Sequence, residues 1–81
     1  MTKHIITETT TTGKLYEIAR ENGIEIVPFP LHRDAIALTI GGQKYIALNP
    51  KERSEAETAR ILRGMIEAHL TGAIKERLPE I

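Results

Sequence analysis

The fold of this chain is decided by residues 35–48, which read AIALTIGGQKYIAL. Two mostly apolar runs flank Gly41 and Gly42, and glycine tolerates the positive φ that a two-residue hairpin turn requires. We therefore expect an antiparallel hairpin. Alternation along its strands gives two sets of four residues, one on each face: Ile36, Leu38, Tyr45 and Ala47, and Ala35, Ala37, Ile46 and Leu48. Both faces are apolar, so the sequence leaves open which one meets the rest of the core.

Downstream of the hairpin, the sequence predicts a long helix over residues 55–71. Ser54 and Glu57 have the spacing of a capping box, in which each side chain satisfies a free backbone N–H at the start of the helix. Gly72 is expected to end the helix, and residues 73–78 allow one more short turn before Pro79. The predicted apolar stripe consists of Ala59, Leu62, Met65, Ile66, His69, Leu70 and Ala73.

Upstream of the hairpin, residues 13–22 predict a first helix, with Thr12 or Gly13 as its N-cap and Asn22-Gly23 as its stop. Residues 24–27 predict a strand, ended by Pro28 because proline cannot donate to a sheet ladder. The order helix, strand, hairpin, helix predicts an α+β fold in which a small three-stranded antiparallel sheet packs against two main helices.

The first residues differ in composition from the rest. Residues 1–12 are rich in threonine and fit either an N-terminal arm or a short strand over residues 4–7. Residues 13–81 are predicted to form a single domain, because no linker or internal repeat interrupts them.

The composition of the 81 residues excludes several classes of protein. Eleven basic and eleven acidic side chains cancel, which argues against a nucleic-acid-binding surface. The absence of cysteine excludes disulfides, thiolate metal ligands and a cysteine nucleophile. We find no apolar run long enough for a membrane span and no signal peptide, so we expect a cytoplasmic protein that does not bind membranes.

Three passages resemble a known family: residues 15–26 (LYEIARENGIEI), 45–50 (YIALNP) and 69–73 (HLTGA). They are similar to the N-terminal part of ImmA/IrrE-type zinc metallopeptidases, which are frequent on bacterial mobile elements. In that family the third passage follows a His-Glu-x-x-His motif, whose two histidines bind zinc from one helix face while the glutamate activates water.

The residues that would carry this motif cannot do its chemistry. Aligned on the tail without gaps, Gly64 and Ala68 stand at the ligand positions and Met65 at the general base. A shift by one residue makes His69 a ligand but leaves Met65 and Ile66 at the other two positions. Glu76 and Glu80, the only carboxylates beyond Gly72, lie too near to match the family's third ligand. The resemblance therefore implies the fold without a zinc site, and we expect no enzyme activity, no metal and no cofactor.

The leading functional hypothesis is a non-catalytic protein-binding module, encoded on a phage or mobile element. It would act as an inhibitor or regulator of a host defence, repressor or toxin complex. The predicted contact residues are Phe29, Leu31, His32 and Arg33 in a loop, and Arg60, Arg63 and Glu67 on the outer face of the second helix.

Two alternatives remain. One is a divergent zinc-dependent metallohydrolase using His4, His32 and His69; the other is a homodimer formed through a sheet edge or a helix face. For His69 we favour a structural role, as a partly buried histidine hydrogen-bonded to the sheet. Gly64 costs helix stability, which we expect to be explained by close approach of the sheet backbone or by a vacated ligand pocket.

Overall fold

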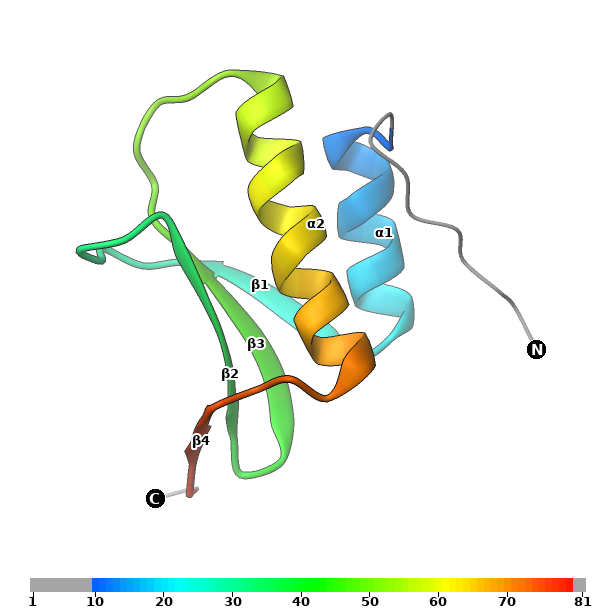
Figure 1. Ribbon diagram of the computed structural model, residues 1–81, viewed down its shortest axis with the longest axis vertical. Helices are drawn as coiled ribbons and strands as arrows, with labels where there is room; N and C mark the ends of the chain where they lie inside the picture. The colour runs from blue at the N-terminus through cyan, green and yellow to red at the C-terminus, as the bar shows by residue number, and fades with distance from the viewer. Residues whose placement is uncertain (1–9, 80–81) are drawn as a thin grey trace.

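A computed structural model describes residues 10–79 of the chain, in which two helices pack on one sheet (Figure 1). The elements in chain order are α1 (Thr12–Glu21), β1 (Ile24–Pro28), β2 (Ala35–Ile40), β3 (Gln43–Leu48), α2 (Glu55–Thr71) and β4 (Glu76–Leu78). The predicted α+β class is confirmed. Residues 1–9, which hold the predicted arm or short strand, lie outside the described residues, and Thr12 already belongs to α1.

The predicted three-stranded antiparallel sheet is wrong. The sheet has four strands in the order β1-β3-β2-β4 and is mixed: β1 is parallel to β3, β2 is antiparallel to β3, and β4 is parallel to β2. The hairpin itself is confirmed, because Ile40 pairs with Gln43 across Gly41 and Gly42, whose φ angles are 57° and 87°.

The two outer strands explain the error. Residues 29–34 carry the chain past the end of β3, so β1 lies beside β3 rather than β2, and two reversals of direction make the pair parallel. Its hydrogen bonding continues beyond the strand, where the Phe29 N–H donates to the Leu48 carbonyl at 3.0 Å. The helical turn predicted after Gly72 is also wrong, since Ile74 is buried and β4 pairs with the free edge of β2.

The helix ends follow local signals. The side chain of Ser54 accepts a hydrogen bond from the Glu57 N–H, so the serine half of the capping box is present, and α2 has the predicted bounds. Gly72 ends α2 at a φ of 79°, as expected. At α1 the N-cap is Thr11, one residue earlier than predicted, and its side chain accepts from the Lys14 N–H.

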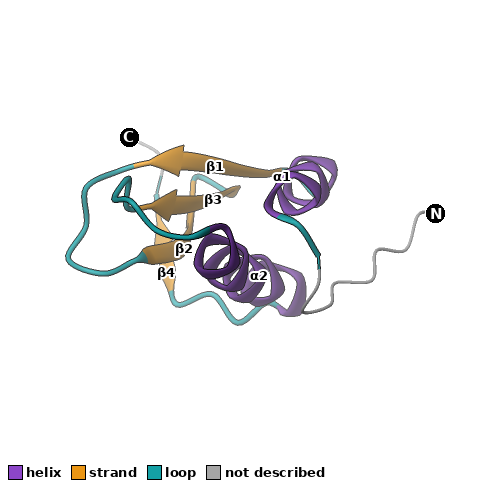
Figure 2. Cartoon of the chain, turned by 90° about the horizontal axis from the view of Figure 1, so that it is seen from above, coloured by secondary structure: helices purple, strands orange, loops and turns teal. Residues whose placement is uncertain are grey.

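Both helices lie on the same side of the sheet (Figure 2), and the core fills the space between these layers. Its members are Leu15, Ile18, Ala19, Ile24, Ala35, Ile46, Ala59, Ile61, Leu62 and Ile66. The hairpin face that the sequence left open is thereby decided, because Ala35 and Ile46 point toward the helices. In the predicted apolar stripe of α2, Leu70 is exposed and Ile61 is buried instead.

None of the helices within residues 10–79 has both the length and the apolar character needed to cross a membrane.

Candidate functional site

The side of the sheet opposite the helices carries an apolar surface, which we call the open face. A shallow hollow of about 560 Å³ in it is lined by Val27, Phe29, Leu31, Ile36, Leu38, Ile40, Tyr45, Ala47 and Leu78. Ala47 is only 8% exposed, whereas Phe29 and Leu78 are more than half exposed. A sheet face that meets water normally carries polar residues at these positions. The open face is therefore the most unusual surface of the described residues.

Strand β2 shows how unusual this surface is. Toward the helices it presents Ala35, Ala37 and Thr39, whose small size lets α2 lie close to the sheet. Away from the helices it presents the larger Ile36, Leu38 and Ile40, of which Ile40 is 37% exposed. A strand that is apolar on both sides is typical of a sheet covered on both faces. The larger side chains of β2 thus lie on the side that residues 10–79 leave uncovered.

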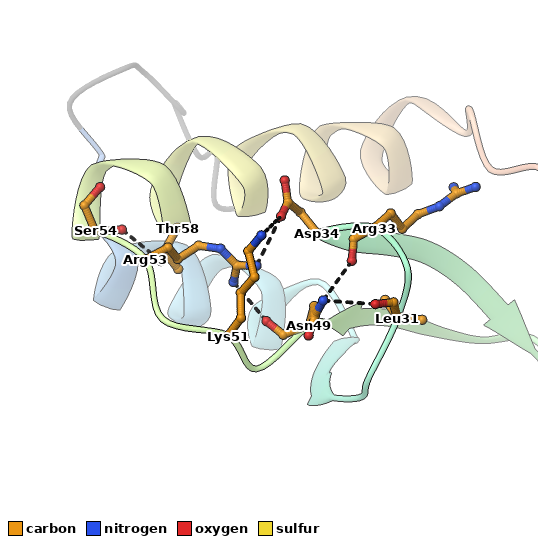
Figure 3. A network of polar contacts seen from close by, with 8 residues as sticks. All are labelled: Leu31, Arg33, Asp34, Asn49, Lys51, Arg53, Ser54 and Thr58. Atoms are coloured by element: carbon orange, nitrogen blue, oxygen red, sulfur yellow. Dashed lines mark hydrogen bonds and ion pairs between the residues drawn. The ribbon is translucent and has the colours of Figure 1, made fainter.

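The loop of residues 29–34 is held at the rim of this face by Asn49 (Figure 3). The Asn49 side-chain amide donates to the carbonyls of Leu31, at 3.1 Å, and Arg33, at 3.3 Å. The Asn49 N–H donates to the Asp34 carbonyl at 2.8 Å. Three hydrogen bonds from one residue fix the backbone of the loop, so Phe29 and Leu31 are presented by an organised segment.

Arg53, which directly precedes the N-cap residue of α2, joins the same network (Figure 3). Its side chain is 5% exposed and donates to the Asn49 carbonyl at 2.9 Å. It also pairs with the Asp34 carboxylate at 3.3 Å, and Lys51 approaches the same carboxylate oxygen at 3.7 Å. Asp34 is thus engaged in structural ion pairs that hold the loop against the segment before α2.

The structure brings only some of the predicted contact residues together. Phe29 and Leu31 line the open face, and His32 and Arg33 are exposed in the same loop. Arg33 instead borders a smaller hollow on the helix side of β2. The others, Arg60, Arg63 and Glu67, are carried by α2 in the opposite layer, so the predicted residues do not form one surface.

Arg60 and Arg63 line a separate shallow hollow beside the start of α1, together with Thr10, Thr11, Glu55, Ala56 and Ala59. There the Glu55 carboxylate accepts hydrogen bonds from the Thr12 N–H at 3.0 Å and the Thr12 hydroxyl at 2.8 Å. These two bonds stabilise the charged carboxylate and lower the pKa of Glu55 below its usual 4.5. The hollow marks the place where the starts of the two helices are tied together.

The residues aligned with the family's zinc motif, Gly64, Met65, Ala68 and His69, do not share one surface. Met65 and Ala68 line the smaller hollow together with Ala35 and Ala37 of β2. Gly64 is exposed, and a Cβ built on it would meet nothing within 4 Å. Close approach of the sheet backbone is therefore not the reason for Gly64, and Gly64 is not among the residues that line the three hollows described above.

His69 has the structural role that we favoured for it. It is 5% exposed, and its Nε2 lies 2.7 Å from the Tyr45 carbonyl, which can only accept. Nε2 must therefore carry the proton, and Nδ1 is buried without a hydrogen-bond partner. The bond ties the last turn of α2 to the middle of β3.

In the zinc alternative His69 could bind a metal only through the buried Nδ1, because Nε2 donates to this carbonyl. His32 is exposed in the 29–34 loop, and His4 lies outside the described residues. Within residues 10–79, no three histidine, aspartate or glutamate side chains gather closely enough to hold a metal ion.

Sequence reasoning missed most of the open face: Val27, Ile36, Leu38, Ile40, Tyr45, Ala47 and Leu78. A signal was present, because both sides of the hairpin were seen to be apolar. The contribution of β1 and β4 had no such signal, since it depends on which strands become neighbours.

Comparison with known proteins adds no identity. No family model matches the chain, and neither a curated protein nor a solved structure gives a significant match. The resemblance to ImmA/IrrE-type peptidases accordingly stays a prediction.

Proposed function

We propose that this chain is a non-catalytic protein-binding domain whose contact surface is the open face of its sheet. The observation that carries the proposal is the apolar side of β2, where Ile36, Leu38 and Ile40 face away from the helices. Large apolar patches of this kind on a small domain mark interaction sites, because exposing them to water is unfavourable. The organised loop that carries Phe29 and Leu31 extends the same surface.

The resemblance to ImmA/IrrE-type peptidases supplies the proposed setting. A chain encoded on a phage or mobile element, with Gly64, Met65 and Ala68 at the motif positions, would keep the scaffold and act by contact. On this basis its partner would be a host defence, repressor or toxin complex, which it would inhibit or regulate. We do not favour a metallohydrolase, because no three histidine, aspartate or glutamate side chains among residues 10–79 gather closely enough to hold a metal ion.

The test compares two variants that make the same change on opposite layers. Leu38→Glu places a charge in the open face, and Leu70→Glu places one on α2, where Leu70 is 46% exposed. The tagged wild type and both variants, each checked for folding by circular dichroism, are used to capture proteins from the organism that encodes the chain. We expect the wild type and Leu70→Glu to retain the same partner and Leu38→Glu to lose it.

Retention of that partner by Leu38→Glu would contradict the proposed surface. Its loss from Leu70→Glu alone would move the contact to the helical layer. An assay of the captured partner's own activity, with and without the purified chain, then tests inhibition directly.

A further inference from the structure

The open face has charges of one sign at its two edges. Glu25 of β1 is the register partner of Tyr45, which in turn pairs with Leu38 of β2, and Leu38 pairs with Glu76 of β4. Register partners share a face, so these residues form one row across the sheet. Two carboxylates therefore stand at opposite ends of a row whose centre is aromatic and aliphatic.

Both carboxylates are available to a partner. Glu25 and Glu76 are exposed, and neither has an ion pair or a hydrogen bond from its side chain to another described residue. Among the nearby cations, Arg77 donates to the Gly72 carbonyl, while Arg33 and Lys75 border the smaller hollow beside β2, which Glu76 also borders without forming an ion pair with either.

We propose that the open face binds a cationic amphipathic helix of another protein, whose apolar stripe is flanked on both sides by lysine or arginine. This inference rests on the proposed function and specifies the partner's chemistry. Lys and Arg side chains beside the stripe would pair with Glu25 on one edge and Glu76 on the other, while the stripe covers Tyr45 and Leu38.

The dimensions of the sheet fit a helix. Neighbouring strands lie about 4.8 Å apart, so the row from β1 to β4 spans about 14 Å. A helix with its side chains is about 10–12 Å wide and fits between the two carboxylates. The six-residue strands β2 and β3 are about 20 Å long, which equals about 14 helical residues. Helices are also the usual cover of sheets with parallel pairs, such as β1 with β3.

A second copy of the chain fits the face less well. Two copies packed face to face about a two-fold axis along the strands would set Glu25 against Glu76 of the other copy. An axis across the strands would set Glu25 near Glu25 instead. Either arrangement opposes like charges, and no cation among residues 10–79 lies on the face to pair them, which is unfavourable in a partly buried contact.

An added strand and an anionic membrane fit less well too. The sheet edges are poor templates for strand addition, because β4 has three residues and β1 ends at Pro28. A face whose charges are carboxylates is repelled by anionic lipid.

The experiment uses two designed peptides of about 14 residues. They share one leucine stripe and differ only in the flanking residues, which are lysine in one and glutamate in the other. Binding of each labelled peptide to the full chain is followed by fluorescence anisotropy, and the contact surface is mapped by amide NMR shifts. We expect the lysine peptide to bind at least about tenfold more tightly, to shift Leu38 and Tyr45, and to weaken as salt rises from about 50 to 500 mM.

A double variant, Glu25→Lys with Glu76→Lys, should reverse the preference between the peptides. Its matched control, Glu17→Lys with Glu57→Lys, makes the same change of net charge on the two helices and should keep the wild-type preference. Because all four positions are exposed, folding should be retained in both variants.

Equal binding of both peptides would overturn the inference and leave the proposed protein-binding function standing, since contact would then be apolar without charge selection. Failure of the lysine peptide to bind overturns the inference as well, and the capture experiment judges the proposed function separately. A dimer in light scattering that Leu38→Glu dissociates would assign the face to a second copy and also overturn it.

Discussion

The two faces of the sheet are built from the same strands and have opposite surroundings. Toward the helices, Ile24 and Ile46 are fully enclosed by α1 and α2. Away from them, Ile36, Leu38 and Ile40 are side chains of similar size, and no other described element covers them. The difference shows that apolar alternation alone does not define a core: a face becomes core only where another element lies against it. It also makes the open face a testable surface.

The largest expected effect comes from one isoleucine on each face. Ile46→Ala should lower the free energy of unfolding by about 3–4 kcal/mol, because it leaves a cavity in a fully buried site. Ile40→Ala should lower it by about 1 kcal/mol or less, because that side chain is already partly in water. Urea unfolding followed by circular dichroism measures both. Similar losses at the two positions would mean that the open face is covered in solution.

His69→Leu should come next. The substitution replaces the imidazole by an apolar side chain of similar size and leaves the Tyr45 carbonyl without the His69 donor. We expect a loss of about 1–3 kcal/mol in the free energy of unfolding, the cost of an unsatisfied buried acceptor. An unchanged stability would show that the bond is not important for holding α2 on the sheet.

Asn49→Asp tests whether the rim of the open face is organised independently. The isosteric carboxylate cannot donate to the Leu31 and Arg33 carbonyls and would face both of them with negative charge. We expect a loss of about 1–2 kcal/mol, with amide exchange rising in residues 29–34 and remaining slow in α2. Slow exchange in that loop would contradict the role assigned to Asn49.

Gly64→Ala should raise stability by about 1 kcal/mol, because alanine has the higher helix propensity and its Cβ meets nothing within 4 Å. The position belongs to neither sheet face, so the gain should leave the contrast between Ile46 and Ile40 unchanged. A thermal melt of the variant checks the sign, and a lower midpoint would mean that Gly64 serves a purpose beyond the helix.

The smallest effect concerns the acid range. Because the folded state lowers the pKa of Glu55, its contribution to stability is present above the ordinary pKa near 4.5 and is lost as pH falls through the lower, folded-state value. Glu55→Gln should therefore flatten the pH dependence of the free energy of unfolding in that acid range. The stability that the substitution removes should be seen above that range, including at neutral pH. A curve that keeps the wild-type slope would contradict the role of Thr12 as donor.

Local signals predicted the parts of the fold that they control. Gly41 and Gly42 specify the hairpin, and Ser54 and Gly72 delimit α2, because each acts on its own backbone within a few residues. The parallel place of β1 and the existence of β4 depend on pairing between distant segments, which no local pattern encodes. For the candidate site, Phe29 was correctly singled out as exposed and apolar, whereas Leu31 is half-buried, and the part of both in binding is still a prediction. Arg60, Arg63 and Glu67 lie on another layer, because the sequence could not tell which sheet face the helices cover.

The strand order has a consequence for the folding pathway. Ile40 and Gln43 meet across two glycines, so β2 and β3 can form early as a local hairpin. Leu38 pairs with Glu76, which lies beyond all of α2, and β1 pairs with β3 across the whole of β2. Pairings between distant segments close larger loops and form later. Glu25 and Glu76 therefore lie on the strands that we expect to join the sheet last. The row of Glu25, Tyr45, Leu38 and Glu76 would then be complete only when folding is nearly finished.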